Sequence, residues 1–463
     1  MMATRSCATI ELAPIESQAR YPPLRHDVQS EDRPSFGSSR RTLAQNGIFE
    51  SGQSQNVVEV TQKWNDPKIN VFRVAACSWG FLVMGANDVV YGALIPYIEE
   101  DYGVDYVVLS IVFLSRFAGY IASATLNDYF HQKLGLRGIP MLCAGCHIAS
   151  HLTIVFHPPY MVTVMAFIIA GFGHGLFDSA LNGWISTLAN STRILSFTGA
   201  FYAFGAMLSP LIATIMITKA HIPWYSFFYV MLGMSIIEIV SLTWSFWNAT
   251  DHGHRGTPNE TEAERENTLT AALFRMPAAR VSWLCAFLLF CYVGIENALG
   301  GWIVLFMATA RGGEAFESGL TATWFWLGLA LGRIVLGFAT PRLGVKIALT
   351  VYITTALGLG LVFVLVPRFL VSAIVVALQG FFLGPLYPGV VIVASKLLPE
   401  HLKVRVIGFA TAMGGCGAAL LPFSVGVLAQ LASVQVLQPT VMVITGIMLA
   451  SWLCLPKIDK RQD

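Results

Sequence analysis

From residue 71 onward the chain alternates between long apolar stretches and short polar segments. A membrane-spanning helix needs roughly 20 mostly apolar residues, and about twelve stretches reach that length. Because backbone polar groups in lipid must be bonded within their own segment, these stretches are predicted to be helices. The expected limits are 71–98, 106–127, 139–157, 160–185, 194–217, 225–247, 279–309, 317–340, 346–366, 369–395, 405–429 and 439–455. The pattern predicts an all-α integral membrane protein with twelve transmembrane helices.

Polar segments divide the chain further. Residues 1–70 are rich in Pro, Ser and Arg and hold no apolar signal-peptide core, so a disordered tail is expected. The longest connection, 248–278, is charged and separates two sets of six spans. The domains predicted are a cytosolic tail at 1–70, a six-helix half at 71–247, a cytosolic loop at 248–278, a second half at 279–455 and a cytosolic tail at 456–463.

Composition supports the membrane class. Charged residues make up 12% of the 463-residue chain and apolar residues 55%, whereas a soluble domain is about 25% charged. So few charges cannot solvate the surface of a soluble protein of this size. The net charge of +2 gives no electrostatic basis for a nucleic-acid partner. All cysteines except Cys7 lie in apolar stretches, so free thiols are expected.

The loop charges predict the orientation in the membrane. If the N-terminus is inside, most Lys and Arg residues of the loops are also inside, and the opposite side carries only Lys219, Arg311 and Arg368. Cytosolic segments carry the excess of basic residues. Both termini and the central loop are therefore predicted to be cytosolic. We expect the plasma membrane, with a vacuolar or other internal membrane as the alternative.

The two sets of spans repeat each other. "GANDVVYG" begins at Gly85 and "GIENALGG" at Gly294, an offset of 209 residues. "LGLR" at 134–137 matches "LGVK" at 343–346, and "GFGHG" at 171–175 matches "GFFLG" at 380–384, both at that offset. "GAMLSP" and "GAALLP" follow at an offset of 212. The fold predicted is two six-helix pseudo-repeats, which is typical of secondary transporters with a site between the halves.

Several ionisable and amide side chains lie inside the predicted spans, and such groups mark functional sites by default. The candidates for proton coupling and substrate binding are Asp88, Asp178, Asn87, Glu296, Asn297, His174, Arg116, Trp302 and Tyr387. The matched motifs give the Asn87–Asp88 pair a counterpart in Glu296–Asn297. His174 and Asp178 are four residues apart and therefore share a helix face.

Each candidate also has a structural interpretation. Asp88 and Asp178 could pair with Arg116 or His174 and only hold helices together. Alternatively, a carboxyl group in an apolar span can gain and lose a proton near neutral pH, and a His–Asp pair can pass one on. Arg116 could equally bind an anionic substrate.

The remaining candidates are open in the same way. Trp302 and Tyr387 either form an aromatic wall or pack in the core. Glu238, in the sixth span, is expected to serve packing. "CAGCH" at 143–147 matches a haem-attachment pattern, but it lies in an apolar helix without room for haem, and no cofactor or metal is expected.

The repeat and its basic turns resemble the major facilitator superfamily. Asp128 and Arg137 in "NDYFHQKLGLR" match an acidic and a basic position of that family's cytosolic loop motif, and "GRIVLGFATPRLG" keeps Arg333 and Arg342. Tyr129 stands where the family has an arginine, so the loop is divergent. The resemblance implies the major facilitator fold and a gating role for these four acidic and basic residues.

Within that superfamily the chain is similar to fungal members of the fucose:proton symporter type over about residues 71–455. The similarity rests on "GANDVVYGALIPYIEEDYG", "GFGHGLFDSALNGWISTLANS", "YVGIENALGGW", "GFFLGPLYPGVVIVASKLLP" and "IGFATAMGGCGAALLPFSVGVLAQ". It implies that Asp88 and Asp178 serve proton coupling and sugar binding. Fucose permease has two amide side chains in its fifth span, where this chain has Gly199 and Tyr202. A less polar solute than fucose is therefore expected.

The function predicted is a monomeric, proton-coupled secondary transporter that moves a small organic solute by alternating access. Its partners are the solute, protons and the lipid bilayer. Uptake of a sugar-like solute and efflux of an apolar metabolite both remain open. A transport-dead membrane receptor of the same fold is the alternative. A membrane enzyme is disfavoured because no nucleophile–base set or metal-ligand cluster occurs at a useful spacing.

Overall fold

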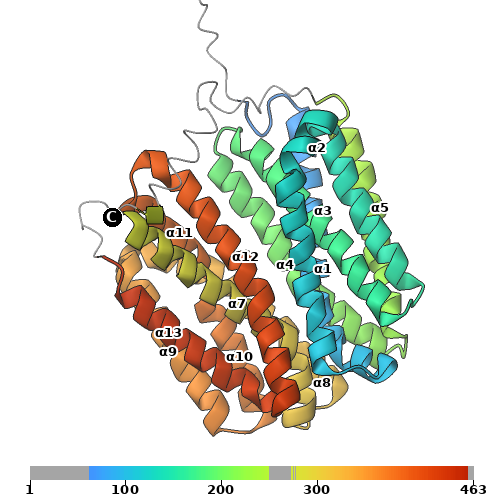
Figure 1. Cartoon of the computed structure of the whole chain (residues 1–463), viewed down its shortest axis with the longest axis vertical. Coiled ribbons are helices and arrows are strands. Elements are labelled where there is room, and N and C mark those ends of the chain that lie inside the picture. The colour runs from blue at the N-terminus through green and yellow to red at the C-terminus, as the bar shows by residue number, and fades with distance from the viewer. Residues whose placement is uncertain (1–61, 250–272, 275, 277, 457–463) are drawn as a thin grey trace, which may run out of the picture. The chain divides into compact units, whose positions relative to one another are not determined.

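The computed structural model of the protein describes residues 62–249, 273–274, 276 and 278–456 (Figure 1). Two bundles of helices are visible, α1 to α5 and α7 to α13. The first contains α1 (Ile69–Tyr102), α2 (Tyr106–Val155), α3 (Tyr160–Ser186), α4 (Ser191–Thr218) and α5 (Phe227–Phe246). The second contains α7 (Ala278–Ala310), α8 (Ala315–Leu343), α9 (Val345–Leu365), α10 (Phe369–Leu383), α11 (Leu386–Leu397), α12 (Glu400–Leu431) and α13 (Leu437–Leu453).

Twelve helical segments in the described part of the chain are long and apolar enough to cross a membrane, as the sequence predicts. The second span, Tyr106–Asn127, has the predicted limits. It continues into the third span within α2, whose helical backbone is interrupted at Gly135, where φ is 60°. The tenth span, Phe369–Leu397, is divided between α10 and α11. Pro385 lies between these two helices and has no N–H to donate to a helical hydrogen bond.

Large apolar side chains are exposed along the helices. Phe338 is 75% exposed, and Met165, Val240 and Leu365 are each exposed by more than half of their surface. In water, contiguous exposed apolar surface favours association. Hydrocarbon solvates these side chains, so the exposed surface agrees with a membrane environment.

Backbone conformation repeats between the halves. Gly103 and Gly312 have φ of 60° and 62°, and Gly135 and Gly344 have φ of 60° and 80°. Each pair is separated by the 209-residue offset of the sequence repeat. Glycine adopts positive φ without the steric cost that a Cβ atom brings. The same turns therefore occur at the same register in both halves.

Helix crossings repeat as well. A Cβ atom added to Gly171 in α3 would overlap the carbonyl oxygen of Arg116 in α2, and one added to Gly380 in α10 would overlap that of Phe325 in α8. Both residues of the second crossing lie 209 positions after those of the first. The absence of side chains at such glycines lets two helical backbones approach closely. The crossings show that the sequence repeat is also a structural repeat.

Close contacts join the halves at the helix ends that the charge pattern assigns to the outer side. A Cβ atom on Gly92 in α1 would overlap the carbonyl oxygen of Gly300 in α7, and Gly319 in α8 lies against Thr214 in α4. The backbone N–H of Tyr106 donates to Gln430 Oε1 across 3.0 Å. The halves are therefore packed together at the predicted outer side.

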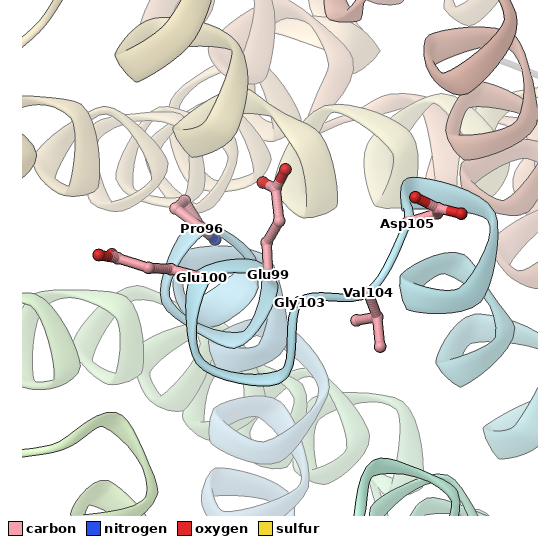
Figure 2. A pocket seen from close by; sticks show the side chains of 6 residues that line it. All are labelled: Pro96, Glu99, Glu100, Gly103, Val104 and Asp105. Carbon is pink, nitrogen blue, oxygen red and sulfur yellow. The ribbon is translucent and has the colours of Figure 1, made fainter.

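The expected domain boundaries stay predictions. Residues 1–61, 250–272 and 457–463, which include most of the tail, the central loop and the C-terminal segment, lie outside the described residues. The acidic loop after α1 is described and is shown in Figure 2. Glu99, Glu100 and Asp105 line an open pocket there, together with Pro96, Gly103 and Val104.

Candidate functional site

Asp88 is the centre of a polar cluster built by four helices. Arg116 Nη1 lies 3.3 Å from Asp88 Oδ1 and also donates to the Asp88 carbonyl oxygen across 2.7 Å. His174 Nδ1 lies 3.2 Å from the same Oδ1 atom. The Tyr202 hydroxyl donates to Oδ2 across 3.0 Å. The carboxylate thus has partners from α2, α3 and α4, yet 26% of its side chain stays exposed.

Glycines place these partners around the carboxylate. A Cβ atom on Gly85 would overlap the carbonyl oxygen of Tyr202, so α1 and α4 cross directly beside Asp88. The contact of Gly171 with Arg116 brings α2 against α3 three residues before His174. The glycines of the sequence motifs therefore decide which polar side chains reach Asp88.

Asp178 has a different environment. It lies one helical turn after His174 on α3 and accepts a hydrogen bond from Asn182 Nδ2 across 3.4 Å. The Tyr120 hydroxyl of α2 also interacts with its carboxylate. These partners are neutral donors, whereas Asp88 faces a guanidinium group. The two aspartates that the sequence treats alike are thus held by different chemistry.

In the other half, Glu296 pairs with Arg333. Arg333 Nη2 lies 3.3 Å from Glu296 Oε1 and 3.4 Å from the Tyr292 hydroxyl. The sequence predicts Arg333 in the cytosolic loop motif, but the structure places it within α8, where it faces α7. A cationic side chain inside a span needs a carboxylate partner, and Glu296 supplies it.

At the 209-residue offset the acids of the two motifs do not coincide. Glu296 corresponds to Asn87, and Asn297 corresponds to Asp88. Asn87 is 1% exposed and bonds His151 Nε2 across 3.1 Å, and Asn297 donates to the Val293 carbonyl oxygen of its own helix. Each half therefore holds one acid in this motif, at adjacent positions of the repeat.

The two predicted aromatic residues lie in different surroundings. Trp302 is fully buried, donates to the Pro422 carbonyl oxygen across 2.8 Å and packs against Phe113. Tyr387 is half-buried, and its hydroxyl lies 3.1 Å from Thr411 Oγ1. The Asp178 carboxylate of the other half also interacts electrostatically with Tyr387. The structure does not bring these two aromatic side chains into one wall.

Three predicted gating residues lie near the helix ends that the charge pattern assigns to the cytosol. Arg137 stacks over the Trp247 ring, 3.8 Å from its centroid. Arg342 occupies the last turn of α8. Asp128 is part of α2, and its side chain is outside what the structure describes. Their gating role stays a prediction.

The sequence interpretation missed His147, His151, Glu238 and Tyr120 as members of this region. The sequence predicts a packing role for Glu238, but His147 Nδ1 lies 2.9 Å from its Oε2 atom. The signal was present, because His147 and His151 are four residues apart and Glu238 is an acid inside a span.

Comparison with known proteins identifies the class. The sequence profile of the Major Facilitator Superfamily matches residues 77–319 and 285–462. The chain therefore belongs to the Major Facilitator Superfamily, a family of membrane transporters of small solutes. It is 29% identical over 420 residues to Bypass of stop codon protein 6 of Saccharomyces cerevisiae, and the aligned region covers 84% of each chain.

Two solved structures show the same fold. The D-xylose-proton symporter matches with a TM-score of 0.66 and 14% identity, over 84% of this chain and 99% of that chain. The transporter FucP in its outward conformation matches with a TM-score of 0.58 and 15% identity, over 83% of this chain and 98% of that chain. The resemblance and the fold class predicted from the sequence are thereby confirmed.

Proposed function

We propose that the protein moves a sugar-like solute together with protons across a membrane by alternating access. The observation that carries this proposal is the mid-span Asp88, which is partly exposed and is bound by Arg116, His174 and Tyr202 from three other helices. An acid so placed is expensive in a membrane and is typical of proton and substrate pathways. The fold shared with a D-xylose-proton symporter supports the same function.

The two aspartates have different tasks in this proposal. Arg116 stabilises Asp88 as the anion, because an opposite charge at short distance favours the charged form. Asp178 faces the neutral donors Asn182 and Tyr120, so a proton on its carboxyl group costs no ion pair. Asp178 is therefore the proton carrier, and Asp88 orients the site and binds the solute.

The solute is sugar-like but makes fewer hydrogen bonds to α4 than fucose makes in fucose permease. The Tyr202 hydroxyl already donates to Asp88, and Gly199 offers no side chain. Fewer donors are left for the solute on α4 than the two amides of fucose permease. The packed outer side, at Gly92 and Gly319, is one of the two arrangements that alternating access needs, and glycines allow helices to separate and close again.

A flux assay tests the proposal. The purified protein is reconstituted into vesicles that contain a pH-sensitive dye, and D-xylose, D-glucose, L-fucose and a set of apolar metabolites are offered singly with an acidic outer medium. We expect at least one sugar to accumulate while the dye reports proton arrival. Accumulation that persists after an uncoupler has abolished the pH gradient would contradict proton coupling.

The predicted orientation has its own test. Asn190, Asn248 and Asn259 begin glycosylation sequons, which are modified only on the non-cytosolic side. Asn190 lies in the turn between α3 and α4, and Asn248 is the second residue after the end of α5. Because all three are predicted to be cytosolic, endoglycosidase should leave gel mobility unchanged. A glycan on Asn259 would show that the protein is inserted the other way round.

We further propose that the protein acts in the plasma membrane as a monomer.

A further inference from the structure

A second polar cluster lies beside the aspartates, between α2 and α5. His147 Nδ1 and Glu238 Oε2 are 2.9 Å apart, and neither side chain has any exposed surface. One turn further along α2, His151 bonds Ser235 Oγ across 2.9 Å and Asn87 Oδ1 across 3.1 Å. Helix α5 therefore contributes a buried carboxyl group to the interior of the first half.

His174 connects this cluster to Asp88. The rings of His147 and His174 meet edge to face, with centroids 4.8 Å apart and an interplanar angle of 76°. The Nδ1 atom of His174 lies 3.2 Å from Asp88 Oδ1. Glu238, His147, His174 and Asp88 thus form a row of alternating contacts in which two imidazole groups lie between two carboxyl groups. A rotation of either ring or one bridging water suffices to pass a proton between the imidazoles.

The hydrogen bonding of this row is incomplete. His147 Nε2, His174 Nε2 and Glu238 Oε1 are buried and have no hydrogen-bond partner among the described residues. Unsatisfied buried polar atoms are rare in folded proteins because each one costs free energy. Three of them gather at one row of titratable groups, and each can gain or lose a proton.

The burial of the His147–Glu238 pair favours a state with a bound proton. In the part of the chain that is described, the only ion pair of Glu238 is the one with His147. A lone carboxylate without exposed surface is strongly disfavoured. Besides the N–H proton of a neutral imidazole, a further proton on the acid or on the ring is therefore favoured. Groups with three or more His, Cys, Asp or Glu placed to hold a metal ion are not found among the described residues.

Among the neighbours of the pair, His174 also contacts Asp88. The titratable groups that interact with the pair are Cys143 and His151 on α2 and His174 on α3, and His174 in turn interacts with Asp88 on α1 and Arg116 on α2. On α1, Gly80 lies beside Glu238 Oε1 and has no side chain to donate. Of the row, Asp88 is the most exposed, at 26%, compared with 7% for His174.

We propose that His147 and Glu238 form a second proton-binding site, which exchanges protons with Asp88 through His174. A proton that has bound the Asp88 carboxylate leaves it from the carboxyl O–H, binds a ring nitrogen of His174 and continues to His147 and Glu238. Each step breaks one O–H or N–H bond and forms another, and no further reactant is consumed. The role of this site in solute coupling rests on the proposed function, whereas its proton binding does not.

Infrared difference spectroscopy on the purified full-length protein tests the site without any solute. Spectra are recorded between about pH 5 and pH 8, the range in which imidazole titrates. Glu238→Gln should remove one carboxyl band of the wild-type difference spectrum, and His147→Gln should shift that band and remove imidazole signals. After a rapid pH jump, His174→Gln should slow the response of the Glu238 band on the order of tenfold or more.

Ser241→Ala is the matched control, because it lies on α5 beside Glu238 and its hydroxyl bonds the Glu238 carbonyl oxygen. It should reproduce the wild-type spectrum. An unchanged spectrum in both Glu238→Gln and His147→Gln would reduce the pair to a packing contact, and an unchanged rate in His174→Gln would refute the route. These results are independent of the flux assay. If the wild-type protein shows no proton-coupled flux, the proposed function is refuted. The infrared bands of the second proton-binding site would still be observed.

Discussion

Asp178→Asn is expected to abolish proton-driven solute accumulation while equal-pool solute exchange continues. The amide resembles the protonated carboxyl group in shape and charge, and the neutral partners Asn182 and Tyr120 can still bond it. Exchange between equal pools needs no net proton movement, so its rate should stay close to that of the wild type. Accumulation should fall to the level of empty vesicles. Both quantities are measured in the vesicles of the flux assay with the sugar that the wild type accumulates.

Asp88→Asn is the informative comparison. It leaves Arg116 facing an amide, and breaking a buried charge pair costs about 3–5 kcal/mol. Because Asp88 is partly exposed, the free-energy cost for this pair is at the low end of that range or below it. Accumulation and exchange should therefore both be lost. Glu296→Gln should weaken solute affinity more than coupling, because its amide can still accept from Arg333. If Asp178→Asn keeps pH-dependent accumulation, Asp178 is not the proton carrier.

The second large effect concerns helix crossings. Gly171→Ala and Gly380→Ala each place a methyl group against a backbone carbonyl oxygen of the neighbouring helix. A backbone atom cannot swing aside, so the helices must separate, and such overpacking typically costs about 1–3 kcal/mol. Because the two glycines occupy the same place in the repeat, the two losses should be similar. Thermal unfolding of the purified protein, followed by tryptophan fluorescence, measures them.

Gly145→Ala and Gly358→Ala are controls for these substitutions. Both glycines lie in helices, and an added Cβ atom would meet nothing within 4 Å. Alanine favours the helix over glycine by about 1 kcal/mol in water, so these variants should be as stable as the wild type or more stable. Equal melting of Gly171→Ala and Gly145→Ala would mean that the crossing of α2 and α3 is looser than the structure shows.

The sequence predicted the architecture well because its signals are local. Span length and composition are fixed by the thickness of the bilayer, and eleven of the twelve predicted spans begin within five residues of the observed limits. The third begins earlier, at Tyr129, because the polar turn "HQKLGLRG" continues as helix on both sides of Gly135. The repeat could also be recognised in the sequence, because equivalent turns of the two halves need glycine at equivalent positions.

Asp88, Asp178, Glu296 and Arg116 could be placed within spans from the apolar stretches that surround them, and the cost of a charge in lipid marks each of them. The sequence by itself did not determine their partners. Side chains from four helices meet at Asp88 only after α1 crosses α4 and α2 crosses α3, and those contacts join residues far apart in the chain. Only the tertiary structure shows that Asp88 is paired with Arg116 and that Asp178 is bonded by neutral donors. It also shows that Glu238, for which the sequence predicts packing, is bonded to a buried histidine. The physical reason is that apolar periodicity specifies where a helix runs, whereas the charge state of a buried group depends on which neighbours the packing brings within bonding distance.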